Sequence, residues 1–95
     1  MKMILAIADA GCLEPLRRTL AALGAPGYTA IGVTEGAGAT GLHTGTRVHP
    51  GGLVAVFVIE SEERAAALFD ELVKRRDASG DCVTRFFLLP VERQA

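Results

Sequence analysis

The sequence predicts an α+β fold in which a four-stranded antiparallel sheet carries two helices on one face. Four runs of β-compatible apolar residues are separated by two segments of helical periodicity, in the order β-α-β-β-α-β. The chain has 95 residues, which make one domain over 1–95, and 49% of them are hydrophobic, enough for one core. When each β-α-β unit crosses over right-handedly, both helices lie on the same side of the sheet. This arrangement is the ferredoxin-like sandwich.

The first half of the chain supplies a strand, a helix and a second strand. The apolar run 2–8 predicts a largely buried strand. A helix follows, marked by leucines at every third or fourth position: Leu13, Leu16, Leu20 and Leu23. Pro15 fits only in a first turn, so the helix begins near 11–14, and Gly24 supplies its end. Residues 28–35 alternate apolar and polar side chains and predict the second strand.

The second half repeats this order. Residues 53–59 predict the clearest strand, and Ser61 is expected to cap a helix that ends with the cations 74–76. The buried stripe of that helix is predicted to be Ala65, Leu68, Phe69 and Leu72. A polar turn is expected over 77–82 and a last strand over 85–91.

Between the two halves, six of the eleven glycines lie in 36–52, which predicts a long loop or a flexible hairpin.

Composition excludes several classes of protein. Ten basic and eleven acidic residues give a net charge of −1, which argues against a nucleic-acid partner. The apolar runs are far shorter than the roughly 20 residues of a membrane span, so we expect no membrane insertion and a cytoplasmic location. Cys12 and Cys82 are then expected to be reduced thiols. The sheet face opposite the helices needs a cover, which oligomerisation would supply.

Five short motifs follow one another along nearly the whole chain: Leu20 with Gly24, then 27–29, Gly36 with Gly38, His43 with Thr44, and the closing strand 86–92. Their order and spacing resemble the PII signalling family. In that family the Gly-His-Thr motif opens a long T-loop, and Leu-Pro-Val-Glu closes the last strand. The resemblance implies a homotrimeric signalling protein rather than an enzyme. It also implies that loop 39–52 regulates a partner, such as a transporter or an enzyme, and that 77–84 is the B-loop.

The resemblance implies an adenine nucleotide effector (ATP, ADP, AMP or a cyclic nucleotide) in clefts between subunits. The residues to which it assigns nucleotide binding are Thr29, Gly36, Gly38, Gly80, Asp81 and Arg85. The glycines let the backbone approach a phosphate and point N–H groups at it. Arg85 stands where the family places a phosphate-binding lysine, counted from the closing strand. The implied partner-binding residues of the loop are His43, Thr44 and Arg47.

The chain departs from the family in the loop and at its end. The loop is shorter, and Thr40 replaces the glutamine on which the family's 2-oxoglutarate and magnesium site relies. The only tyrosine, Tyr28, lies outside the loop, so the family's switch by tyrosine uridylylation is missing. The sequence stops at Ala95, before the arginines that hold phosphates in the family, and we expect this to weaken a triphosphate most.

Two other functions stay open. His43 and His49 on one loop are compatible with a transition-metal site, as in a metal-responsive trimer resembling the CutA proteins. A purely structural trimeric adaptor is the third possibility. The cations 74–76 are either a solvated helix end or a border of the nucleotide site. No nucleophile elbow, phosphate-binding P-loop or carboxylate pair indicates catalysis.

Overall fold

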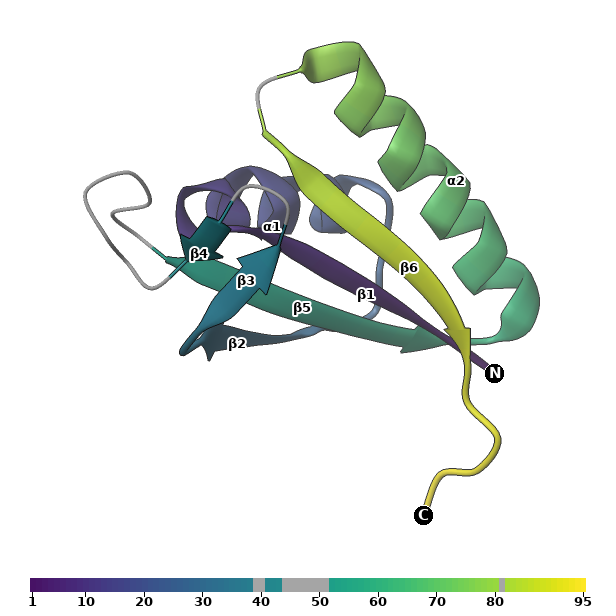
Figure 1. Cartoon of the computed structure of the whole chain (residues 1–95). Helices are drawn as coiled ribbons and strands as arrows, with labels where there is room; N and C mark the ends of the chain where they lie inside the picture. Colours follow the sequence, from purple (N-terminus) through teal and green to yellow (C-terminus); the bar gives the residue numbers. More distant parts are fainter. Residues whose placement is uncertain (39–40, 44–51, 81) are drawn as a thin grey trace.

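The computed structural model describes residues 1–38, 41–43, 52–80 and 82–95 (Figure 1). The elements in chain order are β1 (Lys2–Asp9), a 3₁₀ turn (Ala10–Cys12), α1 (Leu13–Ala22), β2 (Thr29–Val33), β3 (Gly36–Gly38), β4 (Gly41–His43), β5 (Leu53–Glu60), α2 (Glu62–Ser79) and β6 (Thr84–Pro90).

The sheet has the predicted topology. Its four long strands lie in the order β2-β5-β1-β6, and every neighbouring pair is antiparallel. Both helices cover one face of the sheet, and no helix among the described residues lies on the other face (Figure 1). The ferredoxin-like α+β sandwich is therefore confirmed. The short strands β3 and β4 pair with each other, apart from the main sheet, inside the segment predicted as a loop or flexible hairpin.

The core lies between the sheet and the helices, as strand alternation requires. In β1 and β5 every second side chain points to the helices and is buried: Ile4, Ala6, Ala8, Val54, Val56 and Val58. The helices contribute the buried side chains Leu16, Leu20, Ala65, Leu68 and Leu72. Phe69, predicted in the stripe of α2, is only half-buried and packs against this cluster. Each fully buried aliphatic side chain contributes about 1.5–3 kcal/mol.

Two details of α2 differ from the prediction. The helix continues through Ser79, so 77–79 form its last turn rather than a polar loop. It ends at Gly80, whose φ of +67° is the left-handed conformation that glycine tolerates best, and whose N–H donates to the Arg76 carbonyl at 3.1 Å. At the other end Ser61 occupies the N-cap position, but its side chain makes no capping hydrogen bond. Its carbonyl accepts from the Ala65 N–H at 2.9 Å.

The prediction of two reduced thiols was wrong. Cys12 and Cys82 form a disulfide across 70 residues of sequence, with their Cα atoms 6.0 Å apart. Cys12 precedes α1, and Cys82 lies between α2 and β6, so the sequence spacing gave no sign that they meet. The fold brings them together because the end of β1, which precedes Cys12, pairs with the start of β6, which follows Cys82. The bridge ties the start of α1 to the segment that precedes β6.

Candidate functional site

The face of the sheet without helices is apolar and partly exposed. Register places on it the side chains that alternate with the buried ones. Its larger members are Met3, Leu5, Ile7, Ile31, Val33, Leu53, Phe57, Ile59, Phe87 and Leu89, hereafter the open face. Ile31, Ile59 and Phe87 are each between 42% and 49% exposed. Since such a continuous apolar surface is rare on a monomer, it indicates an interaction surface.

Thr29 and Arg85 border this face on opposite edges. Thr29 is the first residue of the edge strand β2 and lies in register with Phe57, while Arg85 lies on the other edge strand, β6, in register with Ile7. Both side chains are exposed and point to the same side of the sheet as the open face. Because β5 and β1 lie between the two edges, about 14 Å of sheet separate them, at roughly 4.8 Å per strand. One copy of the chain therefore does not bring Thr29 and Arg85 together.

The glycine candidates lie near one end of the sheet. Gly36 begins β3 and is opposite His43, and Gly38 is opposite Gly41. A Cβ at Gly36 would lie 3.2 Å from Cδ1 of Leu53, the first residue of β5, so the backbone passes close to the sheet here. The turn after α2 lies at this same end, because β6 begins there beside the end of β1.

Several predicted site residues lie outside the described part of the chain. These are Asp81 of the nucleotide set, Thr44 and Arg47 of the loop set, and His49 of the metal alternative. His43, described only as the last residue of β4, belongs to both latter sets. Among the residues the structure describes, no group of three or more His, Cys, Asp and Glu side chains could hold a metal ion. The search of those same residues also found no helix long and apolar enough to cross a membrane.

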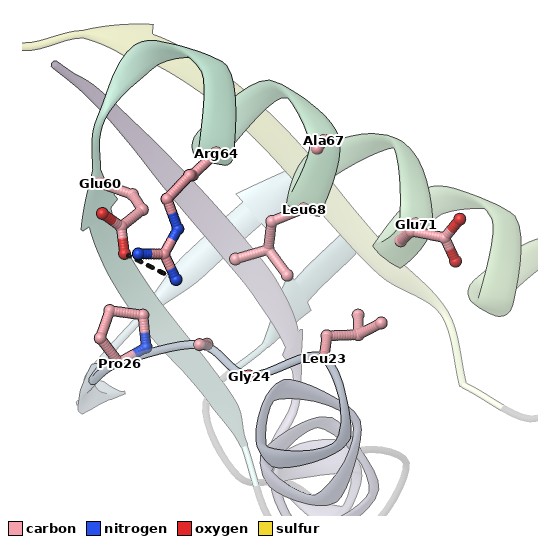
Figure 2. Close-up of a pocket in the computed structure, with 9 residues that line it drawn as sticks. Leu23, Gly24, Pro26, Glu60, Arg64, Ala67, Leu68 and Glu71 are labelled. Atoms are coloured by element: carbon pink, nitrogen blue, oxygen red, sulfur yellow. Dashed lines mark ion pairs between the residues drawn. The ribbon is translucent and has the colours of Figure 1, made fainter.

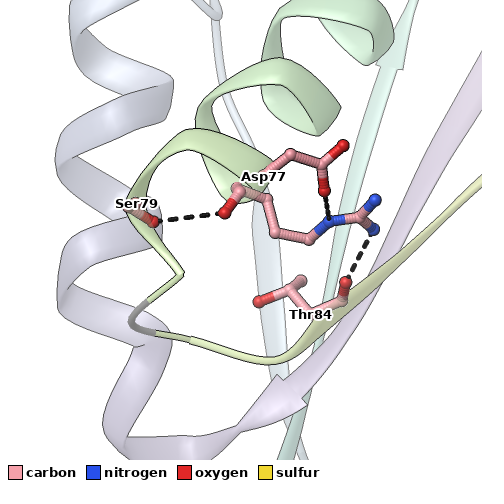
Figure 3. Close-up of polar contacts among 4 residues, drawn as sticks. Asp77, Ser79 and Thr84 are labelled. Atoms are coloured by element: carbon pink, nitrogen blue, oxygen red, sulfur yellow. Dashed lines mark hydrogen bonds and ion pairs between the residues drawn. The ribbon is translucent and has the colours of Figure 1, made fainter.

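Arg76 fixes the turn that carries Gly80. Its Nη1 donates to the Thr84 carbonyl at 3.0 Å and its Nε donates to Asp77 Oδ1 at 3.0 Å (Figure 3). Its guanidinium carbon also lies 5.7 Å from the centre of the Phe86 ring. Charge-assisted bonds of this kind are stronger than neutral ones. The end of α2 is thus attached to the start of β6 by Arg76 and, through Cys82, to α1.

The described residues line a smaller and a larger cavity on the helix side of the sheet. The smaller, about 220 Å³, lies between the end of α1 and the start of α2. Figure 2 shows Glu60 and Arg64 on its wall, with Arg64 Nη2 4.0 Å from Glu60 Oε2. The larger, about 550 Å³, lies between α1 and the last turns of α2. Neither cavity is lined by Thr29, Gly36 or Arg85.

The comparison with protein families decides the relationship. The family model described as Nitrogen regulatory protein P-II matches residues 1–94. The chain belongs to the P-II family. The resemblance drawn from the short motifs is thereby confirmed. No match was found among curated protein sequences.

Solved structures of P-II-like proteins share the fold. The CPII protein of Thiomonas intermedia K12, a nitrogen regulatory PII-like protein bound to ADP, AMP and bicarbonate, is 22% identical and superposes with a TM-score of 0.67. That match covers 97% of this chain and 88% of CPII. A protein of Thermus thermophilus described as PII-like and signaling is 20% identical, with a TM-score of 0.64 over 92% of this chain and 82% of its own. At these identities the comparison establishes the fold.

Sequence reasoning missed the residues that hold the turn after α2. The disulfide had no signal, because two cysteines 70 residues apart are compatible with either redox state. Arg76 had a partial signal: the cations 74–76 predict either a solvated helix end or a border of the nucleotide site, whereas Arg76 is only half-exposed and bonded to β6. The sequence did not predict the last turn of α2, residues 77–79. Because of this turn, Arg76 lies inside the helix and faces β6.

Proposed function

We propose that this P-II family member is a homotrimeric regulatory protein that binds an adenine nucleotide between neighbouring copies of the chain. The observation that carries the proposal is the position of Thr29 and Arg85, which border the open face from opposite edges. When copies pack through their open faces around a threefold axis, the β2 edge of one copy meets the β6 edge of the next. The cleft between them then holds Thr29 from one copy and Arg85 from the other.

The rest of the proposed cleft comes from the turns near these edges. Gly36 and Gly38 would offer backbone N–H groups from one copy, and Gly80 with Asp81 would do so from its neighbour. Arg85 would hold a phosphate through its planar guanidinium. The structures of CPII bound to ADP, AMP and bicarbonate support testing these three ligands first.

The regulatory output would come from the loop 39–52, through His43, Thr44 and Arg47. A ligand that orders such a loop changes which partner it docks on. The partner, a transporter or an enzyme, would be regulated in the cytoplasm. Because disulfides are rare in that compartment, the Cys12–Cys82 bridge must be tested under both oxidising and reducing conditions.

Two measurements test the proposal. Sedimentation equilibrium should give three times the 10.0 kDa mass of the chain. Titration calorimetry with ADP and AMP should give a saturable signal, and Arg85→Ala should weaken binding at least tenfold, since a charge-assisted phosphate contact contributes about 1.5–3 kcal/mol. Arg64→Ala is the matched control, because it removes an exposed α2 arginine that does not border the open face.

The proposal fails if the protein sediments as a monomer, or if no adenine nucleotide gives heat. It also fails if Arg85→Ala binds as tightly as the wild type. A copper- or zinc-dependent rise in melting temperature that is lost in the double variant His43→Ala/His49→Ala would favour the metal-responsive alternative. A stable trimer that responds to no small molecule would favour the structural adaptor.

A further inference from the structure

The larger cavity lies on the side of β6 opposite to Arg85. Thr84 and Phe86, which line it, point toward the helices, whereas Arg85 between them points to the open face. Residues of α1 and of the last turns of α2 form its sides, and Ser79 and Thr84 stand at the end shown in Figure 3. We call this cavity the interhelix cleft. Its volume of about 550 Å³ is within the range of small-molecule sites, about 300–1,000 Å³.

The floor of the interhelix cleft is apolar. Leu16 and Leu72 are buried core residues, and Phe86 is a half-buried ring packed against the same core. The Cys12–Cys82 bridge also lines the cleft. These side chains offer an apolar surface to the body of a ligand and no strong hydrogen-bond donor.

The rim is cationic. Arg18, Arg75 and Arg76 line the interhelix cleft, and none of the described residues that line it carries a carboxylate. Arg76 is engaged by Asp77 and the Thr84 carbonyl, so it acts as part of the wall. Arg75 Nε has a loose ion pair with Glu71, at 3.9 Å, which leaves its two terminal nitrogens unused. Within the described part of the chain, Arg18 has no hydrogen bond or ion pair.

The hydroxyl groups of the interhelix cleft do not compete with these cations. Thr19 Oγ1 donates to the Pro15 carbonyl at 3.0 Å, and Ser79 Oγ donates to the Arg76 carbonyl at 3.4 Å. Both hydroxyl protons are therefore already used in hydrogen bonds to helix carbonyls. The charged donors that remain for a ligand are the guanidinium groups of Arg18 on α1 and Arg75 on α2, which match a carboxylate, sulfonate or phosphate oxygen pair, and the Thr84 hydroxyl is a further neutral donor.

We propose that the interhelix cleft is a binding site for a small amphiphilic organic anion. Its apolar body would lie on Leu16, Leu72 and Phe86, and its single anionic group would be held between Arg18 and Arg75. A large apolar surface with two convergent charged groups is the usual composition of such sites. This site is separate from the proposed nucleotide cleft and does not depend on it.

The test uses 8-anilino-1-naphthalenesulfonate, a fluorescent aromatic anion, on the oxidised full chain. We expect one saturable site per chain, with decanoate as a competitor. The double variant Arg18→Gln/Arg75→Gln should weaken binding at least tenfold. The matched control Lys74→Gln/Arg93→Gln removes the same charge from residues that do not line the interhelix cleft, and should bind within about twofold of the wild type. ADP binding should be unchanged in Arg18→Gln/Arg75→Gln.

Ala78→Phe is a second variant that retains all three arginines and fills the interhelix cleft with a ring. We expect Ala78→Phe to abolish probe binding while its melting temperature stays near that of the wild type. If the double variant does not fold, Ala78→Phe alone tests whether the probe binds in the interhelix cleft. Equal probe affinity in the double variant and its control would overturn the proposal. Unchanged probe affinity of Ala78→Phe would also overturn it. Displacement of the probe by inorganic phosphate, at the concentration at which decanoate displaces it, would do the same, because the apolar body of the ligand would then contribute nothing to binding.

Discussion

The two faces of the sheet are built from the same kinds of residue but have different surroundings. On β5, Val54, Val56 and Val58 point to the helices and are between 2% and 5% exposed. On the same strand Phe57 and Ile59 point the other way, and Ile59 is 49% exposed. The helix-covered face is completed within one chain, whereas in the described part of the chain no helix covers the open face. The covered face therefore stabilises the monomer, whereas the open face, with its polar edges, is exposed and available for assembly.

Substitutions of two neighbouring residues of β5 should give the largest difference between the two faces of the sheet. Val56→Asp places an unpaired carboxylate in the core, where burial of such a charge costs several kcal/mol, and should leave the chain unfolded at 25 °C by circular dichroism. Phe57→Asp places the same charge on the open face, and should leave a folded monomer that no longer assembles. Ala67→Asp, on the exposed side of α2, should change neither the fold nor the mass. A trimeric Phe57→Asp variant would show that the open face is not the interface.

Loss of the disulfide should have the next largest effect on stability, and this effect should be confined to the helix-covered side of the sheet. Closing a loop of 70 residues restricts the unfolded chain, so reduction or Cys82→Ser should lower the free energy of unfolding by about 2–4 kcal/mol in urea titrations. The mass of the assembly should not change at concentrations where the monomer stays folded. Reductant added to Cys82→Ser is the control and should have no further effect. Dissociation of the proposed wild-type trimer by reductant, without unfolding, would contradict the separation of the two faces.

Arg76 should give a smaller effect on the same side. Arg76→Ala removes the charged bond to the Thr84 carbonyl and the contact with the Phe86 ring, and should cost about 1–3 kcal/mol in the free energy of unfolding. Arg75→Ala, its exposed neighbour on α2, should cost within about 0.5 kcal/mol. Equal losses in the two variants would mean that the Arg76 contacts do not hold the turn after α2.

The fold could be predicted because its determinants are local and periodic. Leucines at helical spacing fix α1, and the apolar run of β5 fixes a central strand. The end of α2 could not be predicted in the same way, because Asp77 and Ser79 are equally typical of a turn. One determinant is tertiary, because Arg76 reaches β6. The other is local, because Gly80 provides the left-handed residue that ends the helix beyond the cations 74–76.

The candidate site was predicted residue by residue, but its geometry was not. Thr29 and Arg85 were chosen by family spacing, which says nothing of the sheet between them. The strand order explains why they border one face from opposite edges, and it follows from the crossover connections rather than from either residue. The disulfide and the interhelix cleft depend on contacts between segments far apart in sequence, for which Cys12 and Arg18 carry no local signal.

The most direct test of the central account is a mixing experiment on the proposed cleft. Thr29→Trp blocks one wall and Arg85→Ala removes the phosphate contact of the other, so neither variant alone should bind ADP with wild-type affinity, although each should remain trimeric. In trimers reassembled from equal amounts of both variants, about one cleft in four takes its Thr29 and its Arg85 from unmodified edges. Calorimetry should then recover ADP binding at about a quarter of the clefts with wild-type affinity. Mixed trimers that bind no ADP would contradict a site shared between neighbouring copies.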